Sequence, residues 1–102
     1  MNDEIIAIKN RILEQLKSEK IYIFGSYARG SFNAQSDYDF YIVMPDATQD
    51  LNVVSTQAYM SLRGLKRRPV DFVVDTKSNF DLRVKMDTLE RTVFNEGIVL
   101  YA

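Results

Sequence analysis

Two aspartates separated by one residue are the first candidates for chemistry in this sequence. Asp37 and Asp39 stand at the start of an apolar and aromatic run, 40–44, that predicts a β-strand. Side chains two apart on a strand leave the same face, and two like charges there repel each other unless a cation lies between them. Magnesium prefers carboxylate oxygens together with phosphate and water. The pair therefore fits a magnesium site; the alternative is a solvated start to the strand, because short acidic pairs are common at turns.

A glycine and a serine, Gly25 and Ser26, follow a short β-branched and aromatic segment, 21–24, that predicts another strand. Backbone N–H groups in such a turn, with a serine hydroxyl beside them, can cradle phosphate oxygens. Arg29 lies in a segment, 28–30, that can begin a short helix, and its guanidinium could approach the same phosphate. The ordinary alternatives are a tight turn for the glycine and serine and a solvated side chain for the arginine.

A third carboxylate, Asp71, lies inside the apolar strand predicted over 69–74. Its apolar neighbours predict burial, where an unpaired charge would be costly. An ion pair with Arg67 or Arg68 would offset that cost. Asp75, at the end of the same strand, is expected to cap the next helix.

Composition excludes several other kinds of chemistry. The 102 residues contain no cysteine and no histidine, which removes disulfide scaffolds, zinc–thiolate sites and the Ser-His-Asp triad. Thirteen basic and 14 acidic residues give a net charge of −1, which argues against direct nucleic-acid binding by bulk charge. The basic run Arg63, Lys66, Arg67 and Arg68 is either an anion-facing patch or a solvated face. The acidic start and the short apolar runs predict a cytoplasmic protein with no membrane segment, and the length predicts one domain over 1–102.

Hydrophobic periodicity predicts the elements that must position these residues. An amphipathic helix is predicted over 5–16, with Asn2 as its cap and with Lys17 and Lys20 at its C-terminal end. Strands are predicted over 21–24, 37–44, 69–74 and 98–101, and further helices over 51–65 and 80–95.

Connection lengths predict how the strands pair. The eleven residues from 26 to 36 are marginal for a parallel crossover, so the first two strands are expected to be antiparallel. More than twenty residues containing a helix separate the second strand from the third, which is enough for a right-handed crossover. This arrangement is an α/β (α+β) fold in which helices flank a small mixed sheet. One rim of the sheet would gather Gly25, Ser26, Asp37, Asp39 and Asp71.

The segments 24–30 and 36–40 together resemble the signature of the polymerase-β-like nucleotidyltransferases, in which Gly-Ser is followed after ten residues by Asp-x-Asp. The segment 70–72, Val-Asp-Phe, matches the later strand that carries a single aspartate in that family. The short length resembles the minimal nucleotidyltransferases, which are often encoded beside a helical HEPN-type protein as the antitoxin of a toxin–antitoxin pair. The resemblance therefore implies a polymerase-β-like nucleotidyltransferase fold.

The resemblance also implies a role for each site residue. Gly25 and Ser26 would hold the terminal phosphates of a nucleoside triphosphate. Asp37 and Asp39 would bind two Mg²⁺ ions, and Asp71 would complete one metal site and help to deprotonate an acceptor hydroxyl.

The implied reaction is the transfer of AMP from ATP to a hydroxyl, with a tyrosine of the HEPN-type partner toxin as the acceptor. The chain lacks a second domain for an antibiotic, tRNA or primer, so part of the acceptor site is expected from a partner in a homo- or hetero-oligomer. Two alternatives stay open: a catalytically silent, nucleotide-binding antitoxin that neutralises its partner by complex formation, and a purely structural interaction module. The presence of all three acidic residues favours the enzyme.

Overall fold

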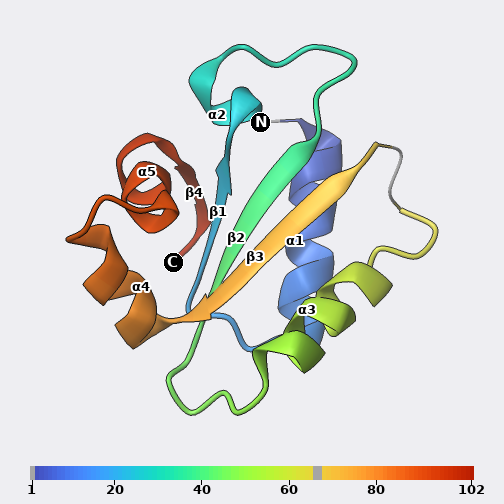
Figure 1. Cartoon of the computed structure of the whole chain (residues 1–102). Coiled ribbons are helices and arrows are strands. Elements are labelled where there is room, and N and C mark those ends of the chain that lie inside the picture. The colour runs from blue at the N-terminus through green and yellow to red at the C-terminus, as the bar shows by residue number, and fades with distance from the viewer. Residues whose placement is uncertain (1, 66–67) are drawn as a thin grey trace.

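A four-stranded mixed sheet, formed within the residues 2–65 and 68–102 that this computed structural model describes, has helices on both faces (Figure 1). The strands are β1 (Lys20–Phe24), β2 (Tyr38–Met44), β3 (Val70–Thr76) and β4 (Ile98–Tyr101). The helices are α1 (Asp3–Gln15), α2 (Ser26–Arg29), α3 (Leu51–Met60), α4 (Lys77–Val84) and α5 (Leu89–Glu96). The predicted α+β class is confirmed. No helix in the described part of the chain is long and apolar enough to cross a membrane.

The strand order is β3-β2-β1-β4, so β3 and β4 form the two edges. β1 is antiparallel to both β2 and β4, whereas β2 is parallel to β3. Both predicted pairings are confirmed. The register places Phe24 opposite Asp39 and Asp39 opposite Asp71. The end of β1 and the starts of β2 and β3 therefore lie at one rim of the sheet, next to α2 (Figure 1).

The two faces of the sheet pack against different helices. α1 and α3 cover one face, and α4 and α5 lie on the other (Figure 1). The larger core lies on the α1 side and includes Ile5, Ile8, Ile12, Phe40, Ile42, Val54, Ala58 and Phe72. The smaller core contains Tyr22, Tyr41, Val43, Phe80 and Val93. Because strand side chains alternate, Asp39 shares the face of Tyr41, and Asp71 shares that of Val73, on the side of α4 and α5.

α1 begins where the sequence predicts and ends earlier. The Asn2 carboxamide oxygen accepts a hydrogen bond of 2.8 Å from the backbone N–H of Ile5, as the predicted cap requires. Leu16 is already extended and buried, so Lys17 and Lys20 are not in the last helical turn, and the prediction that they interact with the helix end is wrong. Lys20 is instead the first residue of β1.

The helices that follow β2 and β3 are shorter than predicted. α3 ends at Met60 because the Ser61 hydroxyl donates to the carbonyl of Ala58 at 2.7 Å, and a left-handed Gly64 (φ +76°) follows. The single helix predicted over 80–95 is two helices, α4 and α5. The break comes before Thr88, whose hydroxyl accepts from the N–H of Arg91 and thereby caps α5.

The residue that caps α4 also differs from the prediction. Thr76 is the cap, because its hydroxyl accepts a hydrogen bond of 3.4 Å from the N–H of Asn79. Asp75 remains in β3, where its carboxylate accepts from the Thr76 N–H at 2.8 Å and from the Asn79 side chain at 3.0 Å. Asp75 therefore contributes hydrogen bonds at the start of α4, but it lies one residue before the cap position.

Candidate active site

The three candidate carboxylates are brought to the same rim by β2 and β3. Asp37 immediately precedes β2, Asp39 is the second residue of β2, and Asp71 is the second residue of β3. Asp39 and Asp71 are direct neighbours in the parallel register. Asp39 is half-buried, while Asp37 and Asp71 are exposed. The expectation that Asp71 is buried is wrong, because this residue lies near the start of an edge strand.

The charges of these carboxylates influence one another. Burial raises the pKa of the Asp39 carboxyl, and the negative charges of Asp71 and Asp37 raise it further. Arg29 acts in the opposite direction and lowers that pKa. The rim thus concentrates negative charge around Asp39, and a cation bound there would relieve the repulsion.

Gly25 lies directly against the Asp39 carboxylate. Its φ of +72° belongs to the region that favours glycine. A Cβ atom at this position would overlap Oδ2 of Asp39. The sequence therefore needs a glycine here both for the backbone conformation and for the close approach of the two segments.

Ser26 and Arg29 follow on the short helix α2. Ser26 is its first residue, so its backbone N–H belongs to the turn of the helix that has no partner within the helix. Arg29 is exposed at the other end of α2, and its charge acts on Asp39. The structure therefore places all three candidate phosphate-binding residues, Gly25 included, beside the carboxylates.

Arg68, one of the two residues expected to pair with Asp71, forms its hydrogen bonds with other residues. Within the described ranges, Asp71 forms no ion pair with Arg68. Arg68 instead donates to two backbone carbonyls in the loop before β2, those of Asn33 at 3.1 Å and Ser36 at 3.0 Å. The other expected partner, Arg67, and Lys66 lie outside the described residues. No local pattern indicates this role of Arg68, because its contacts join segments that are far apart in the chain.

The carboxylate oxygens at the rim are the type of ligand that magnesium prefers. Among the residues 2–65 and 68–102, no three acidic side chains are close enough to hold a metal ion by themselves. Magnesium, however, is commonly held by one or two carboxylates and completed by substrate phosphates and water. Asp39 and its acidic neighbours are the carboxylate ligands that the protein would contribute to such a site.

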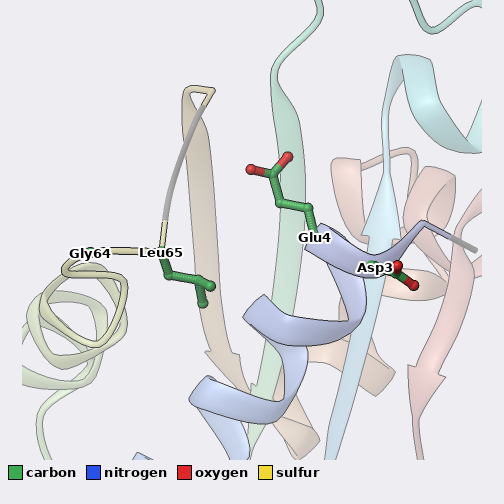
Figure 2. A pocket seen from close by; sticks show the side chains of 4 residues that line it. All are labelled: Asp3, Glu4, Gly64 and Leu65. Atoms are coloured by element: carbon green, nitrogen blue, oxygen red, sulfur yellow. The ribbon is translucent and has the colours of Figure 1, made fainter.

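A separate pocket on the α1 side does not suit a phosphate. It has a volume of about 410 Å³ and is lined by Asp3, Glu4, Gly64 and Leu65. Figure 2 shows that its acidic side chains come from the first turn of α1, opposite the segment that follows α3. Two carboxylates would repel a triphosphate, and the pocket lies on the other face of the sheet from Asp39.

The mixed sheet, its helices and the glycine–carboxylate rim define an α+β domain of the nucleotidyltransferase type. Residues 5–95 match the family model described as "Nucleotidyltransferase domain", and the chain belongs to this family. The resemblance inferred from the motifs is thereby confirmed at the level of the nucleotidyltransferase family.

Similar proteins cover the chain almost completely. "Putative protein adenylyltransferase MJ0604" of Methanocaldococcus jannaschii is 30% identical over 107 residues, which span 99% of this chain and 100% of the relative. A crystal structure of a toxin–antitoxin with AMP-PNP is 24% identical, with a TM-score of 0.63 over 99% of this chain and 74% of that one. A mutant of the toxin–antitoxin MntA-HpeT is 22% identical, with a TM-score of 0.69 over the same shares. The two structures confirm the fold.

Proposed function

We propose that this protein is a Mg²⁺-dependent adenylyltransferase that transfers AMP from ATP to a tyrosine hydroxyl of a HEPN-type toxin and thereby acts as its antitoxin. The observation that carries the proposal is the rim itself, where Asp39 is the register partner of Asp71 and lies against Gly25. The family membership supports nucleotidyl transfer. The name of the Methanocaldococcus relative supports a protein acceptor, and the toxin–antitoxin neighbours support a toxin as that acceptor.

The roles of the residues follow from their places at the rim. Gly25, Ser26 and Arg29 bind the terminal phosphates, because they combine free N–H groups, a hydroxyl and a positive charge. Asp37 and Asp39 hold the magnesium ions, and Asp71 completes one of these sites. When bound, magnesium neutralises charge on the phosphates and orients the α-phosphate for attack.

The reaction exchanges a phosphoanhydride bond of ATP for a phosphate ester bond to the acceptor. The acceptor oxygen forms a bond to the α-phosphorus, and the bond from that phosphorus to the bridging oxygen of the β-phosphate breaks. Pyrophosphate leaves with the electron pair of the broken bond. Asp71 accepts the proton of the hydroxyl and passes it to solvent, a task for which the chain has no histidine. The exposure of Asp71 on an edge strand leaves room for an acceptor from another molecule.

The Asp71→Asn variant tests the catalytic part of the proposal. It keeps the size of the side chain and removes the charge that holds metal and accepts a proton. We expect the variant to fold and to bind Mg²⁺–ATP, while single-turnover transfer falls by at least ~10²-fold. Asp87→Asn, at an exposed aspartate between α4 and α5, is the matched control and should transfer normally. Near-wild-type transfer by folded Asp71→Asn protein would refute the role of Asp71.

The acceptor is tested by incubation of the protein with labelled ATP and a purified HEPN-type toxin. Mass spectrometry should find AMP on a toxin tyrosine, and changing that tyrosine to phenylalanine should abolish labelling. Tight complex formation without transfer would instead support the catalytically silent antitoxin. Modification of a small molecule such as an aminoglycoside, with none of the toxin, would contradict the protein acceptor.

A further inference from the structure

The loop that carries Asp37 needs an external anchor. Residues 31–37 connect α2 to β2 and contain no helix or strand. The loop's own hydrogen bonds are local: Ser31 N–H donates to the Ser26 carbonyl of α2 at 3.0 Å, Asn33 N–H donates to the Ser36 hydroxyl at 3.0 Å, and Ser36 N–H donates to the Asn33 carbonyl at 3.1 Å. These bonds shape the turn but do not fix it relative to the sheet.

Arg68 supplies that anchor from the segment leading to β3. Its Nη1 atom donates to the carbonyls of Asn33 at 3.1 Å and Ser36 at 3.0 Å, which bridges 32 residues of sequence in the second case. Ser36 is the residue immediately before Asp37. Hydrogen bonds from a charged donor are among the stronger ones, and two of them fix the orientation of the loop. The position of Asp37 is therefore coupled to the start of β3, the strand that carries Asp71.

The same guanidinium packs against the aromatic residues around the aspartates. Its central carbon lies 4.5 Å from the ring centroid of Phe32 and 5.2 Å from that of Tyr38. The two rings are parallel to within 2°, with centroids 5.8 Å apart. Tyr38, between Asp37 and Asp39, is also fixed at its far end, where its hydroxyl donates to Glu4 at 2.8 Å and accepts from Asn2 at 3.1 Å. Tyr38 is thus held by α1 at one end and by Arg68 at the other.

From these contacts we infer that Arg68 is a positioning residue of the active site, which sets Asp37 relative to Asp39 for magnesium binding. The inference rests on the proposed function and goes beyond it, since within the described part of the chain Arg68 contacts the loop carbonyls and two aromatic rings rather than a phosphate-binding residue or a carboxylate. Arg68 donates both hydrogen bonds from Nη1 and packs its flat guanidinium against those two rings, and lysine does not reproduce that flat surface. The positive charge that lowers the pKa of Asp39 is that of Arg29.

The test compares Arg68→Lys and Arg68→Gln with the wild type and with Arg63→Gln. Within the described part of the chain, Arg63 is exposed and forms no hydrogen bond with residues 31–37, so its loss removes one positive charge from the same basic run without disturbing the loop. Calorimetric titration of ATP at increasing Mg²⁺ gives the Mg²⁺ concentration for half-maximal binding. We expect both Arg68 variants to need roughly 10-fold more Mg²⁺, the lower end of what the loss of a supporting contact costs a metal site. Arg63→Gln should match the wild type.

Amide hydrogen exchange provides a readout that needs no ligand. Both Arg68 variants should exchange faster at residues 31–37, with amides of β1 and β2 unchanged. An unchanged Mg²⁺ requirement in Arg68→Gln would overturn the inference, and so would full rescue by lysine, which would show that the flat guanidinium surface has no role. If the wild type binds ATP equally well with and without Mg²⁺, the proposed function fails. If the wild type requires Mg²⁺ and the Arg68 variants behave like it, the proposed function stands and this inference fails.

Discussion

Gly25 combines a backbone conformation that favours glycine with a neighbour that leaves no room for a side chain. Gly30, five residues later, has a similar φ of +78° but has nothing within 4 Å of an added Cβ. The two glycines share a positive φ but differ in ψ, which is −149° at Gly25 and 11° at Gly30, and in the contact of Gly25 with Asp39. Gly30→Ala therefore reports the cost of an alanine with positive φ away from the site, whereas Gly25→Ala adds a less favourable backbone conformation and a clash with Asp39.

We expect Gly25→Ala to weaken Mg²⁺–ATP binding and Gly30→Ala to leave it unchanged. Gly30→Ala should lose roughly 1 kcal/mol of stability, because alanine disfavours the left-handed conformation, and Gly25→Ala should lose more, because its φ and ψ lie where essentially only glycine is found. Only Gly25→Ala displaces the Asp39 carboxylate. Thermal unfolding and ATP titration on the same preparations measure the two effects, and equal binding by both variants would show that the Gly25–Asp39 contact has no functional role.

A second prediction concerns the charge of Asp39 in the absence of metal. The folded protein holds the proton of this carboxyl more tightly than the unfolded chain does, so ionisation of Asp39 lowers the free energy of unfolding. The loss develops as pH rises from the unfolded pKa of about 3.9 through the raised folded value. Asp39→Asn should therefore raise the Tm at pH 7 without metal, by roughly 1–8 °C if relief of like charges contributes ~0.2–1 kcal/mol.

The pH series provides the check on Asp39→Asn. The difference in Tm from the wild type should disappear near pH 3, where Asp39 is protonated in both states. Asp87→Asn should not raise the Tm at pH 7. A lower Tm for Asp39→Asn at neutral pH would mean that the carboxylate forms a stabilising contact that outweighs the repulsion.

At the level of single residues, the sequence predicted which side chains meet but not how they are held. The spacing of Gly25, Asp37 and Asp39 and the lone aspartate of the third strand correctly placed all of them at one rim. The exposure of Asp71 was missed because local apolar neighbours do not reveal that a strand lies at the edge of the sheet. The contacts of Arg68 were missed because they depend on tertiary distance.

Among the elements, α5 is joined to the sheet by a buried polar network. The Tyr41 hydroxyl of β2 donates to Oε2 of Glu90 at 2.7 Å, and Nε of Arg83 in α4 donates to Oε1 at 3.1 Å. Burial alone would raise the pKa of the Glu90 carboxyl, but the hydrogen bonds from Tyr41, from its own backbone N–H and from Arg83 together lower it. Burial and the Glu90 charge raise the pKa of Tyr41, so its hydroxyl keeps the donated proton at neutral pH.

Tyr41→Phe should destabilise the protein, because it leaves a buried carboxylate without one of its donors. We expect a loss of roughly 1–3 kcal/mol at pH 7 by denaturant unfolding. Since the folded pKa of Glu90 is lowered, the stability it contributes is present above its unfolded pKa of about 4.3 and is lost as pH falls through the folded value. The difference in the free energy of unfolding between Tyr41→Phe and the wild type should become smaller below pH 4. Tyr101→Phe, at an exposed tyrosine of β4, is the control.

Hydrophobic periodicity does not predict where one helix ends and the next begins. The segment 80–95 reads as one weak helix because its apolar residues continue across the break. Thr88 interrupts it by a side-chain hydrogen bond, an effect of a single residue that a hydrophobic pattern does not contain. The strands were predicted to within two residues, since β-branched and aromatic runs bounded by glycine and proline are a strong local signal.

Across the whole molecule, nucleotide binding at the rim joins segments from three parts of the chain. A ligand that binds only the folded state adds about 2.7 kcal/mol of stability at 100 times its Kd. For a domain of this size that corresponds to a Tm increase of roughly 10–20 °C. We expect ATP with Mg²⁺ to produce this shift and ATP with EDTA to produce a much smaller one. Equal shifts in both conditions would contradict a metal-dependent site.

The separation of these segments also has a consequence for synthesis of the protein on the ribosome. A nascent chain that has emerged through residue 60 carries Gly25, Ser26, Asp37 and Asp39 but not Asp71. The last carboxylate joins the others only when β3 adds to β2 in a parallel pairing across α3, and non-local pairings of this kind are slow to form. Under the proposed function, newly made antitoxin therefore gains its full set of carboxylates only after β3 has docked on β2, when Gly25 and Ser26 have already left the ribosome.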